Sequence, residues 1–482
     1  MSATTWEMVV GLEVHVQLKT ATKAFCACSA EFGAAPNSNT CPVCLGLPGA
    51  LPVLNDQAVE LAIRAALATG CVVHETSIFS RKNYFYPDLP KGYQISQFDR
   101  PLATGGALDV LVGEQPMRIG ITRIHMEEDA GKSLHDRYAS ATAIDLNRAG
   151  VPLCEIVSEP DMRTSAQAGA YLRALKQVLE YAAVSDCSME LGSLRVDANV
   201  SARPKGATEL RTRTEIKNVN SFSNVERALD LEFARHVATY EAGGTIVQQT
   251  MLYDGAKQEV RAARTKEGSH DYRYFPEPDL PPLVVPTTRV DRIRGALPEF
   301  PAAKVARYQA DLGLNAVEAN VLASSAHLAR YFEALHAKGA HAKGAANWIT
   351  GAAMQALNER SLEPAALDGL MPVNALARIL ALVQAGTISS SAAKTVFSAV
   401  LADPSTSPDA VVAAQGLAQV SDDSALVKWI DEVFAELPAE AARFVGGERK
   451  LQGVLIGAIM KKSKGSADPK KLAQLLGARV TG

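Results

Sequence analysis

The chain has 482 residues, enough for about three domains of ordinary size. No stretch approaches the ~20 apolar residues that span a bilayer, and a net charge of −3 excludes a globally positive field, so any nucleic acid must meet a local basic patch. The odd number of cysteines, seven, and a start without a basic or apolar leader predict a cytoplasmic protein away from any membrane.

The first predicted element is a half-buried strand, because residues 12–18 alternate between apolar and polar. Glu13, His15 and Gln17 then share one face of that strand. Further along, His125-Met126-Glu127-Glu128-Asp129 supplies three more carboxylates. Massed carboxylates usually face a cation, and mixed oxygen and nitrogen ligands suit a catalytic divalent metal, Mg²⁺ where a phosphate is bound. A solvated strand face with ordinary salt bridges has the same spacing and stays an alternative.

Two close pairs of cysteines follow the first strand. Cys26 and Cys28 precede Cys41 and Cys44 by a short loop, the spacing of a structural four-cysteine zinc site. Four thiolates close a tetrahedron and leave no position for water, so the predicted role is structural. Four unrelated buried cysteines are the alternative, and a disulfide pair is less favoured in a reducing compartment.

The chain changes character near Pro276. Before it, strands and glycine turns mix with helices predicted at 171–182 and 225–242, whereas the proline-rich stretch 275–282 continues neither helix nor central strand. Alanine-rich helices follow, among them 302–312, 326–338 and 373–385, with a second linker at 404–408. We therefore expect a catalytic domain over 1–290 with a zinc-binding insertion at 26–44, a helical domain over 291–403 and a helical tail over 404–482.

The tail is predicted to bind RNA through its positive charge. From Arg449 onward, the sequence contains eight Lys or Arg residues and one acid, Asp468. Such a surface neutralises phosphates and releases counterions, although a solvated terminal helix has the same composition. The predicted contacts are Arg449, Lys450, Lys461, Lys462 and Lys464.

The common phosphate-binding loops are missing from the sequence. Ala130-Gly131-Lys132-Ser133 resembles the end of a P-loop, but Met126 stands where the first glycine is required. A nucleotide would then depend on a metal and on cationic clamps. Polar segments that could converge on a phosphate supply the candidate nucleotide- and substrate-binding residues Lys82, Tyr84, Tyr86, Arg195, Asn199, Lys217 and Asn218.

Long motifs throughout the chain carry a resemblance. They are G-L-E-V-H-V-Q-L from Gly11, C-P-V-C-L-G-L-P-G from Cys41, R-K-N-Y-F-Y-P-D-L-P-K-G-Y-Q-I-S-Q from Arg81, H-M-E-E-D-A-G-K-S from His125, D-L-N-R-A-G-V-P-L from Asp145, I-V-S-E-P-D from Ile156 and D-Y-R-Y-F-P-E-P-D-L-P-P from Asp271. Over its whole length the chain resembles the B-subunit family of the aspartyl-tRNA(Asn)/glutamyl-tRNA(Gln) amidotransferases, and more closely its bacterial branch. It departs from the family pattern at Leu191 and Met251, where the family usually has Glu and Arg.

The resemblance implies a glutamine-synthetase-like α+β catalytic domain with an antiparallel sheet, followed by two all-helical domains. It implies a ligase that uses ATP to phosphorylate the side-chain carboxylate of misacylated Glu-tRNA(Gln) or Asp-tRNA(Asn). Ammonia from a partner amidase, the A subunit, then displaces the phosphate, in a heterotrimer completed by a small C subunit. The implied cofactors are Mg²⁺ and a structural Zn²⁺.

An acyl phosphate requires Mg²⁺ to neutralise the phosphate oxygens, so we expect its ligands among the clustered acids. The predicted Mg²⁺ ligands are Glu13, His15 and Glu128, and Glu127 and Asp197 complete the predicted catalytic set. Lys82, Arg195 and Lys217 are expected to clamp phosphate or carboxylate, and Glu127 or Asp129 to position ammonia. A small-molecule carboxylate–ammonia ligase and a non-catalytic, zinc-bearing RNA scaffold are the alternatives in other classes.

Overall fold

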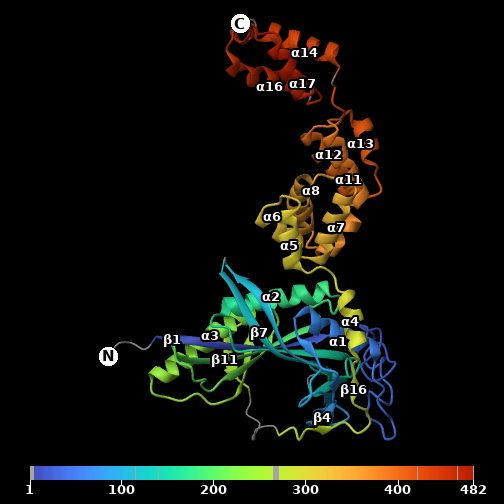
Figure 1. Cartoon of the computed structure of the whole chain (residues 1–482), viewed down its shortest axis with the longest axis vertical. Coiled ribbons are helices and arrows are strands. Elements are labelled where there is room, and N and C mark those ends of the chain that lie inside the picture. The colour runs from blue at the N-terminus through green and yellow to red at the C-terminus, as the bar shows by residue number, and fades with distance from the viewer. Residues whose placement is uncertain are drawn as a thin grey trace. The chain divides into compact units, whose positions relative to one another are not determined.

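The structure is a computed structural model that describes residues 5–113, 115–138, 140–263, 271–420, 422–463 and 465–480. The chain divides into two compact units, Met1–Phe300 and Pro301–Gly482 (Figure 1). The predicted tRNA contact Lys464 lies outside the described residues.

A nine-stranded sheet organises the first unit, in the order β14-β13-β12-β11-β1-β10-β7-β6-β2. All neighbouring strands run antiparallel except β12 and β13, which run parallel. In chain order the strands are β1 (Trp6–Gln17), β2 (Val72–Val73), β6 (Ala103–Val112), β7 (Gln115–Glu128), β10 (Pro152–Ser158), β11 (Leu194–Pro204), β12 (Thr214–Val219), β13 (Thr250–Asp254) and β14 (Glu259–Ala262). Strand β1 therefore lies at the centre, between β10 and β11.

The two faces of β1 have different neighbours because its side chains alternate as the sequence predicts. Leu12, Val14 and Val16 are buried in the core, whereas Glu13 and His15 point to the other face. Helices α1 (Asp56–Ala68), α2 (Ser165–Tyr181) and α3 (Phe222–Glu241) contribute buried residues to this core. Each begins at a side-chain N-cap, and these caps are Asn55, Thr164 and Ser221.

Smaller elements frame this unit. A three-stranded sheet joins β15 (Phe275–Pro276), β4 (Ser80–Asn83) and β5 (Tyr93–Ser96), and two further pairs join β16 (Leu283–Val284) to β3 (Thr76–Ser77) and β8 (Lys132–Tyr138) to β9 (Ala141–Asp145). Helix α4 (Thr287–Gly295) packs on α1. The proline-rich stretch is thus tied back into the first unit, which continues to Phe300 rather than ending at 290.

The second unit is helical and contains two separate hydrophobic cores. The first core draws on α5 (Pro301–Ala310), α6 (Ala316–Ala323), α7 (Ala326–Ala337), α8 (Ala342–Trp348), α9 (Met354–Glu359), α10 (Leu367–Leu370), α11 (Val373–Gln384), α12 (Ser390–Ala402) and α13 (Pro408–Gln415). The second core draws on α14 (Asp423–Glu436), α15 (Pro438–Val445), α16 (Gln452–Lys462) and α17 (Pro469–Gly477). Because α13 belongs to the first core, the break between the cores falls after the linker at 404–408.

The predicted fold class is confirmed: a mixed α/β region with a large, mostly antiparallel sheet precedes a helical region. Of the two departures from the family pattern, Met251 is a core residue of β13 and Leu191 is half exposed, at 50%. Within the described residues no single helix is long and apolar enough to cross a membrane. The bent pair Pro364–Leu370 and Val373–Gln384 passes that test only jointly, and its apolar side chains lie in the first helical core.

Candidate active site

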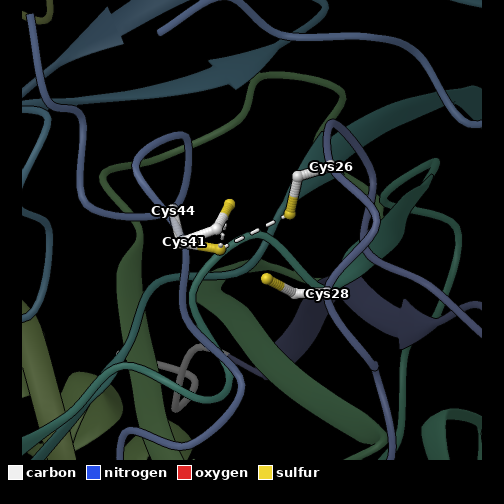
Figure 2. A group of neighbouring side chains, drawn as sticks. All are labelled: Cys26, Cys28, Cys41 and Cys44. Atoms are coloured by element: carbon white, nitrogen blue, oxygen red, sulfur yellow. Dashed lines mark hydrogen bonds between the residues drawn. The ribbon is translucent and has the colours of Figure 1, made fainter.

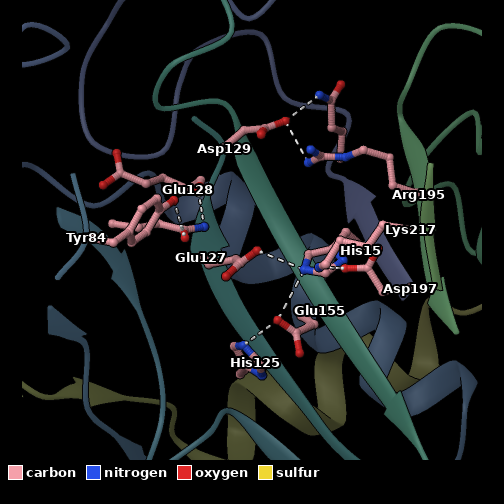
Figure 3. A network of polar contacts seen from close by, with 12 residues as sticks. His15, Tyr84, His125, Glu127, Glu128, Asp129, Glu155, Arg195, Asp197 and Lys217 are labelled. Carbon is pink, nitrogen blue, oxygen red and sulfur yellow. Dashed lines mark hydrogen bonds and ion pairs between the residues drawn. The ribbon is translucent and has the colours of Figure 1, made fainter. Parts of the chain in front are cut away.

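A row of ionisable side chains crosses the sheet on the face opposite the core (Figure 3). In the strand register His15 stands directly across from Glu155 of β10, and Glu155 stands across from His125 of β7. One step along β1, Glu13 stands across from Asp197 of β11. Like charges directly opposite each other destabilise a sheet, so this arrangement calls for cations on the same face.

One group in the row contains His15, Glu127 and Glu155. His15 Nε2 lies 3.2 Å from Glu155 Oε2 and 3.5 Å from Glu127 Oε1, and His125 Nε2 lies 3.3 Å from the same Glu155 oxygen. Glu127 is only 3% exposed, and its Oε2 finds no hydrogen-bond partner in the described part of the chain. An orphaned buried carboxylate oxygen beside an imidazole fits the ligand set of a divalent metal.

A second group contains Glu13, Asp197 and Glu215 of β12. One carboxylate oxygen from each lies within 4.8 Å of the others, so oxygens alone form a second possible cation site. Lys217 joins it, with Nζ 2.5 Å from Asp197 Oδ2 and 3.1 Å from Glu215 Oε1. Asn199 donates a hydrogen bond of 3.0 Å to Glu13 Oε1. The structure thus separates Glu13 from His15, although the sequence placed both on one metal.

The charges of these groups depend on one another. Burial alone would lower the pKa of His15, but Glu155 and Glu127 raise it to about 9. Burial opposes the charge of Glu155 as well, yet the ion pairs with His125 and His15 hold the pKa of that carboxyl well below its usual range. Burial and the nearby Glu155 and Glu215 raise the pKa of Glu13. The proton on His15 and the ammonium group of Lys217 therefore occupy the places where metal cations would be expected to bind.

Glu128 and Asp129 point to other partners. Glu128 forms an ion pair with Lys91 and accepts a hydrogen bond of 2.9 Å from the backbone N–H of Ile95, so its carboxylate does not join either group. Asp129 accepts hydrogen bonds from Arg195 at 2.9 Å and from Gln17 at 3.0 Å. The predicted clamp Arg195 is therefore at the end of the row, beside Asp129.

Of the other predicted binding residues, Lys82 interacts electrostatically with Glu127 and Glu155 of the first group. Burial disfavours its charge, but the neighbouring Glu127 raises the pKa of Lys82 above its usual range. Tyr84 donates to Gln94 at 3.1 Å, while Tyr86 is 46% exposed. Asn218 donates instead to the backbone carbonyl of Tyr253 at 3.2 Å, an arrangement that serves the sheet.

A cavity of about 140 Å³ opens beside the second group, on the same face. The residues that line it include Gly11, Glu13, Asn199 and the exposed Arg211 and Arg213. The Arg211 guanidinium lies over the rings of Trp6 and Tyr240, and Arg213 supplies a second cationic side chain to the lining, so the cavity suits an anion such as a phosphate.

The four predicted zinc ligands lie together. Sulfur atoms of Cys26, Cys28, Cys41 and Cys44 are all within 4.8 Å of one another and face a common space (Figure 2). Cys44 Sγ lies 3.4 Å from Cys26 Sγ and 3.7 Å from Cys41 Sγ. The hydrogen bond from Cys26, with help from Lys23, lowers the pKa of the Cys44 thiol to about 4, whereas that same hydrogen bond raises the pKa of Cys26 and burial raises the pKa of Cys28, so thiolate is favoured at Cys44. Four sulfurs without an open position fit structural zinc.

Three of the basic residues in the tail form ion pairs with acids in the structure. Lys462 pairs with Glu432 and Glu436 of α14, and Lys471 and Arg479 pair with other acids of that helix. For Arg449, Lys450 and Lys461, all exposed, no ion pair is recorded within the described residues. These three keep their charge available for a polyanion.

Sequence reasoning did not nominate Glu155 and Glu215 as site residues. Glu155 is a single acid inside the apolar run Pro152-Leu153-Cys154-Glu155-Ile156-Val157, and that isolation was the available signal. Glu215 shares a predicted strand with Lys217, but its approach to Glu13 depends on the register of β11 with its two neighbours. Strand order cannot be read from one strand's periodicity.

Comparison with known proteins agrees with this architecture. A sequence model of the GatB/GatE catalytic domain matches residues 8–291, and one of the GatB domain matches residues 330–480. A catalytic sheet domain with acidic clusters followed by helices thus defines a protein of the GatB/GatE class.

Full-length relatives identify the family within this class. The chain is 51% identical over 480 residues to the B subunit of the aspartyl/glutamyl-tRNA(Asn/Gln) amidotransferase from Geobacter sulfurreducens, covering 99% of this chain and 100% of the relative. It is 50% identical over 486 residues to the B subunit from Anaeromyxobacter sp., with 100% of both chains covered, and 49% identical over 471 residues to that of Solidesulfovibrio magneticus, with 98% of both covered. The chain belongs to the family of aspartyl/glutamyl-tRNA(Asn/Gln) amidotransferase B subunits.

Proposed function

We propose that this chain activates and amidates the side-chain carboxylate of Glu-tRNA(Gln), Asp-tRNA(Asn) or both, using ATP. The observation that carries the proposal is the row of two carboxylate groups on one face of the sheet, one built on His15 and one on Glu13. A carboxylate oxygen of the substrate attacks the γ-phosphorus and ADP leaves. Ammonia then attacks the acyl carbon, phosphate leaves with the bonding electrons, and one proton is lost.

We choose the proposed metal ligands from the two carboxylate groups in the structure, not from the sequence alone. His15, Glu127 and Glu155 would hold one Mg²⁺, and Glu13, Asp197 and Glu215 a second. Bound there, Mg²⁺ would neutralise phosphate oxygens during transfer. Support comes from Glu127 Oε1 and Glu155 Oε2, which converge on His15 in the first group, and from the all-oxygen donor set of the second. Glu128, which pairs with Lys91, is left out of both sets.

Cationic side chains of the chain would orient the phosphates. Lys217 already bridges Asp197 and Glu215, so a phosphate arriving there meets an ammonium that needs little movement. Arg213, which lines the adjoining cavity, would bind ATP phosphates. Lys82, beside Glu127, would face the acyl phosphate from the other end of the row.

Glu127 is a better candidate than Asp129 for the acid that positions ammonia. Asp129 already accepts from Arg195 and Gln17, and Arg148 Nε lies 3.6 Å away. The Asp129 carboxylate is thus already held by a guanidinium and an amide. Glu127 keeps one oxygen free of hydrogen bonds among the described residues and lies beside His15, so it can hold an N–H of ammonia.

The remaining parts of the proposal concern structure and partners. Cys26, Cys28, Cys41 and Cys44 would bind a structural Zn²⁺. The exposed Arg449, Lys450 and Lys461 would bind tRNA. An amidase (the A subunit) would supply ammonia, and a small C subunit would complete the heterotrimer in the cytoplasm. We regard the small-molecule ligase and the RNA scaffold as weaker, since the chain's relatives are named as tRNA amidotransferase subunits and the carboxylate row suits catalysis.

The test is a transamidation assay of the purified three-subunit complex. We would supply ATP, glutamine and each mischarged tRNA in turn, and quantify ADP and amidated aminoacyl-tRNA. ADP formation that requires charged tRNA, matched by Gln-tRNA(Gln) or Asn-tRNA(Asn), is expected. ADP formation driven by free glutamate or aspartate would favour the small-molecule ligase, and no ADP formation at all would favour the scaffold.

A further inference from the structure

Lys23 is a fully buried lysine that touches the cysteine cluster. It is 0% exposed, although lysine is rarely found without any contact to solvent. Its Nζ lies 2.7 Å from the carbonyl oxygen of Asn39, 3.3 Å from that of Leu146 and 3.4 Å from Cys44 Sγ. An ammonium has three N–H donors, so each donor has one acceptor and the group is fully satisfied.

The charge of Lys23 has one ionisable partner among these three, the sulfur of Cys44. No Asp or Glu in the described part of the chain forms an ion pair with it, and the two carbonyls are neutral. A buried charge without a counter-charge is strongly disfavoured. Conversely, four thiolates carry more negative charge than one zinc ion carries positive charge. A buried ammonium against the most buried of the four cysteines offsets that excess.

The two carbonyls that Lys23 binds belong to different parts of the fold. Asn39 lies in the loop between the cysteine pairs, and Leu146 lies in the turn after β9. Further hydrogen bonds join these segments: Leu146 N–H donates to Asn37 Oδ1, and Asn39 N–H donates to Asn147 Oδ1. The same turn reaches the active site through Arg148, which lies 3.6 Å from Asp129.

We propose that Lys23 is an outer-sphere partner of the zinc–thiolate centre, where its ammonium offsets thiolate charge and fastens the zinc loop to the turn at 144–150. The inference rests on the zinc centre proposed above. Partners of this kind orient metal ligands, and losing one typically weakens metal binding about 10- to 100-fold. The expected consequence is a zinc ion that leaves more readily when the lysine charge is absent.

The test compares Lys23→Met with Lys19→Met in the full-length chain within its complex. Methionine keeps the apolar stem of lysine without its charge, and Lys19 is an exposed lysine four residues away. After zinc content is measured, release would be followed with a chromogenic chelator at fixed concentration. We expect release from Lys23→Met to be about 10- to 100-fold faster than from the native chain, and release from Lys19→Met to be unchanged.

A second measurement uses the native protein, in case Lys23→Met fails to fold. Reductive methylation followed by peptide mass spectrometry should leave Lys23 unlabelled while zinc is bound, label it once zinc is chelated, and label Lys19 equally in both states. Stoichiometric zinc with unchanged release from a folded Lys23→Met chain, or prompt labelling of Lys23 in the zinc-bound protein, would overturn this inference alone. Absence of zinc from the native chain would overturn the zinc centre and this inference together.

Discussion

Glu155 of β10 stands directly across from His15 of β1, and its Oε2 lies 3.2 Å from the Nε2 of that histidine. The same oxygen lies 3.3 Å from His125 Nε2. A carboxylate between two imidazoles on a buried sheet face acts as their shared counter-charge. Glu155 is also a candidate metal ligand. A divalent cation would bind neutral His15 and so displace the His15 proton that Glu155 stabilises.

Replacement of Glu155 by Gln should weaken metal binding more than replacement of Glu128 by Gln. Glu155 belongs to the group with His15 and Glu127, whereas Glu128 is held by Lys91 and the N–H of Ile95. We expect Mn²⁺ affinity, measured by electron paramagnetic resonance, to fall by at least about tenfold in Glu155→Gln. The exposed Glu259→Gln should bind as the native chain does. A larger loss in Glu128→Gln would restore Glu128 to the metal site and remove Glu155.

Glu13→Ala and His15→Ala should each suppress phosphoryl transfer while leaving the ammonia supply intact. Each change removes one ligand from a different carboxylate group. Loss of about 4 kcal/mol of transition-state stabilisation corresponds to a rate about a thousandfold lower. ADP formation dependent on charged tRNA would report the transfer step, and basal glutaminase activity of the partner amidase would serve as the internal control. Near-native ADP formation in either variant would exclude that residue from the catalytic metal site.

The sequence predicted which residues share a face, but not which residues meet. Alternation along β1 was sufficient to put Glu13 and His15 on the polar face, because period 2 is a property of a single strand. Their division between two groups depends on β10, β11 and β12, and the pairing of β1 with β10 and with β11 joins residues more than a hundred positions apart. Local cysteine spacing, by contrast, was enough to predict that the four cysteines meet, because both pairs lie on short loops.

Zinc should be a structural component of the chain. Replacement of Cys41 and Cys44 by Ser should remove bound zinc and lower the melting temperature, because metal binding to a closed four-cysteine site contributes directly to folding. The catalytic activity of the site on the sheet should fall less than the stability of the chain. Inductively coupled plasma mass spectrometry would give the metal content and circular dichroism the melting temperature. Less than stoichiometric zinc in native protein purified without chelator would count against the site.

Glu232 should support the first unit in a pH-dependent manner. It is 0% exposed, and although burial opposes its charge, hydrogen bonds from Arg235, His236 and Thr214 lower its pKa to about 2. A lowered folded-state pKa adds stability above the unfolded value near 4.5, and that stability is lost as the pH falls toward 2. Glu232→Ala should therefore cost about 3 kcal/mol at pH 7, with Arg235 and His236 left unpaired.

The measurement for Glu232 is thermal unfolding followed by circular dichroism at pH 7 and at pH 3. The melting temperatures of native and Glu232→Ala chains should lie far apart at pH 7 and approach each other at pH 3. The exposed Glu259→Ala serves as the control and should match the native chain at both values. A constant difference between native and variant would show that Glu232 acts through packing rather than through its charge.

The helical tail should hold tRNA through Arg449, Lys450 and Lys461 rather than through its total charge. These three are exposed and have no recorded ion pair among the described residues, whereas Lys462, Lys471 and Arg479 pair with acids of α14. Phosphate contacts supply affinity by counterion release and little sequence information. Replacing the unpaired three by Gln should therefore raise the KM for tRNA and flatten its salt dependence, with kcat retained at saturating tRNA.

The matched control replaces the paired set Lys462, Lys471 and Arg479 by Gln, which changes the net charge equally. Transamidation would be measured against tRNA concentration at two salt concentrations for both triple variants. If only the unpaired set shifts KM and the salt slope, local phosphate contacts explain tRNA binding. Equal shifts in both would mean that the tail acts through its overall field, and an unchanged KM in the unpaired variant would mean that these side chains are merely solvated.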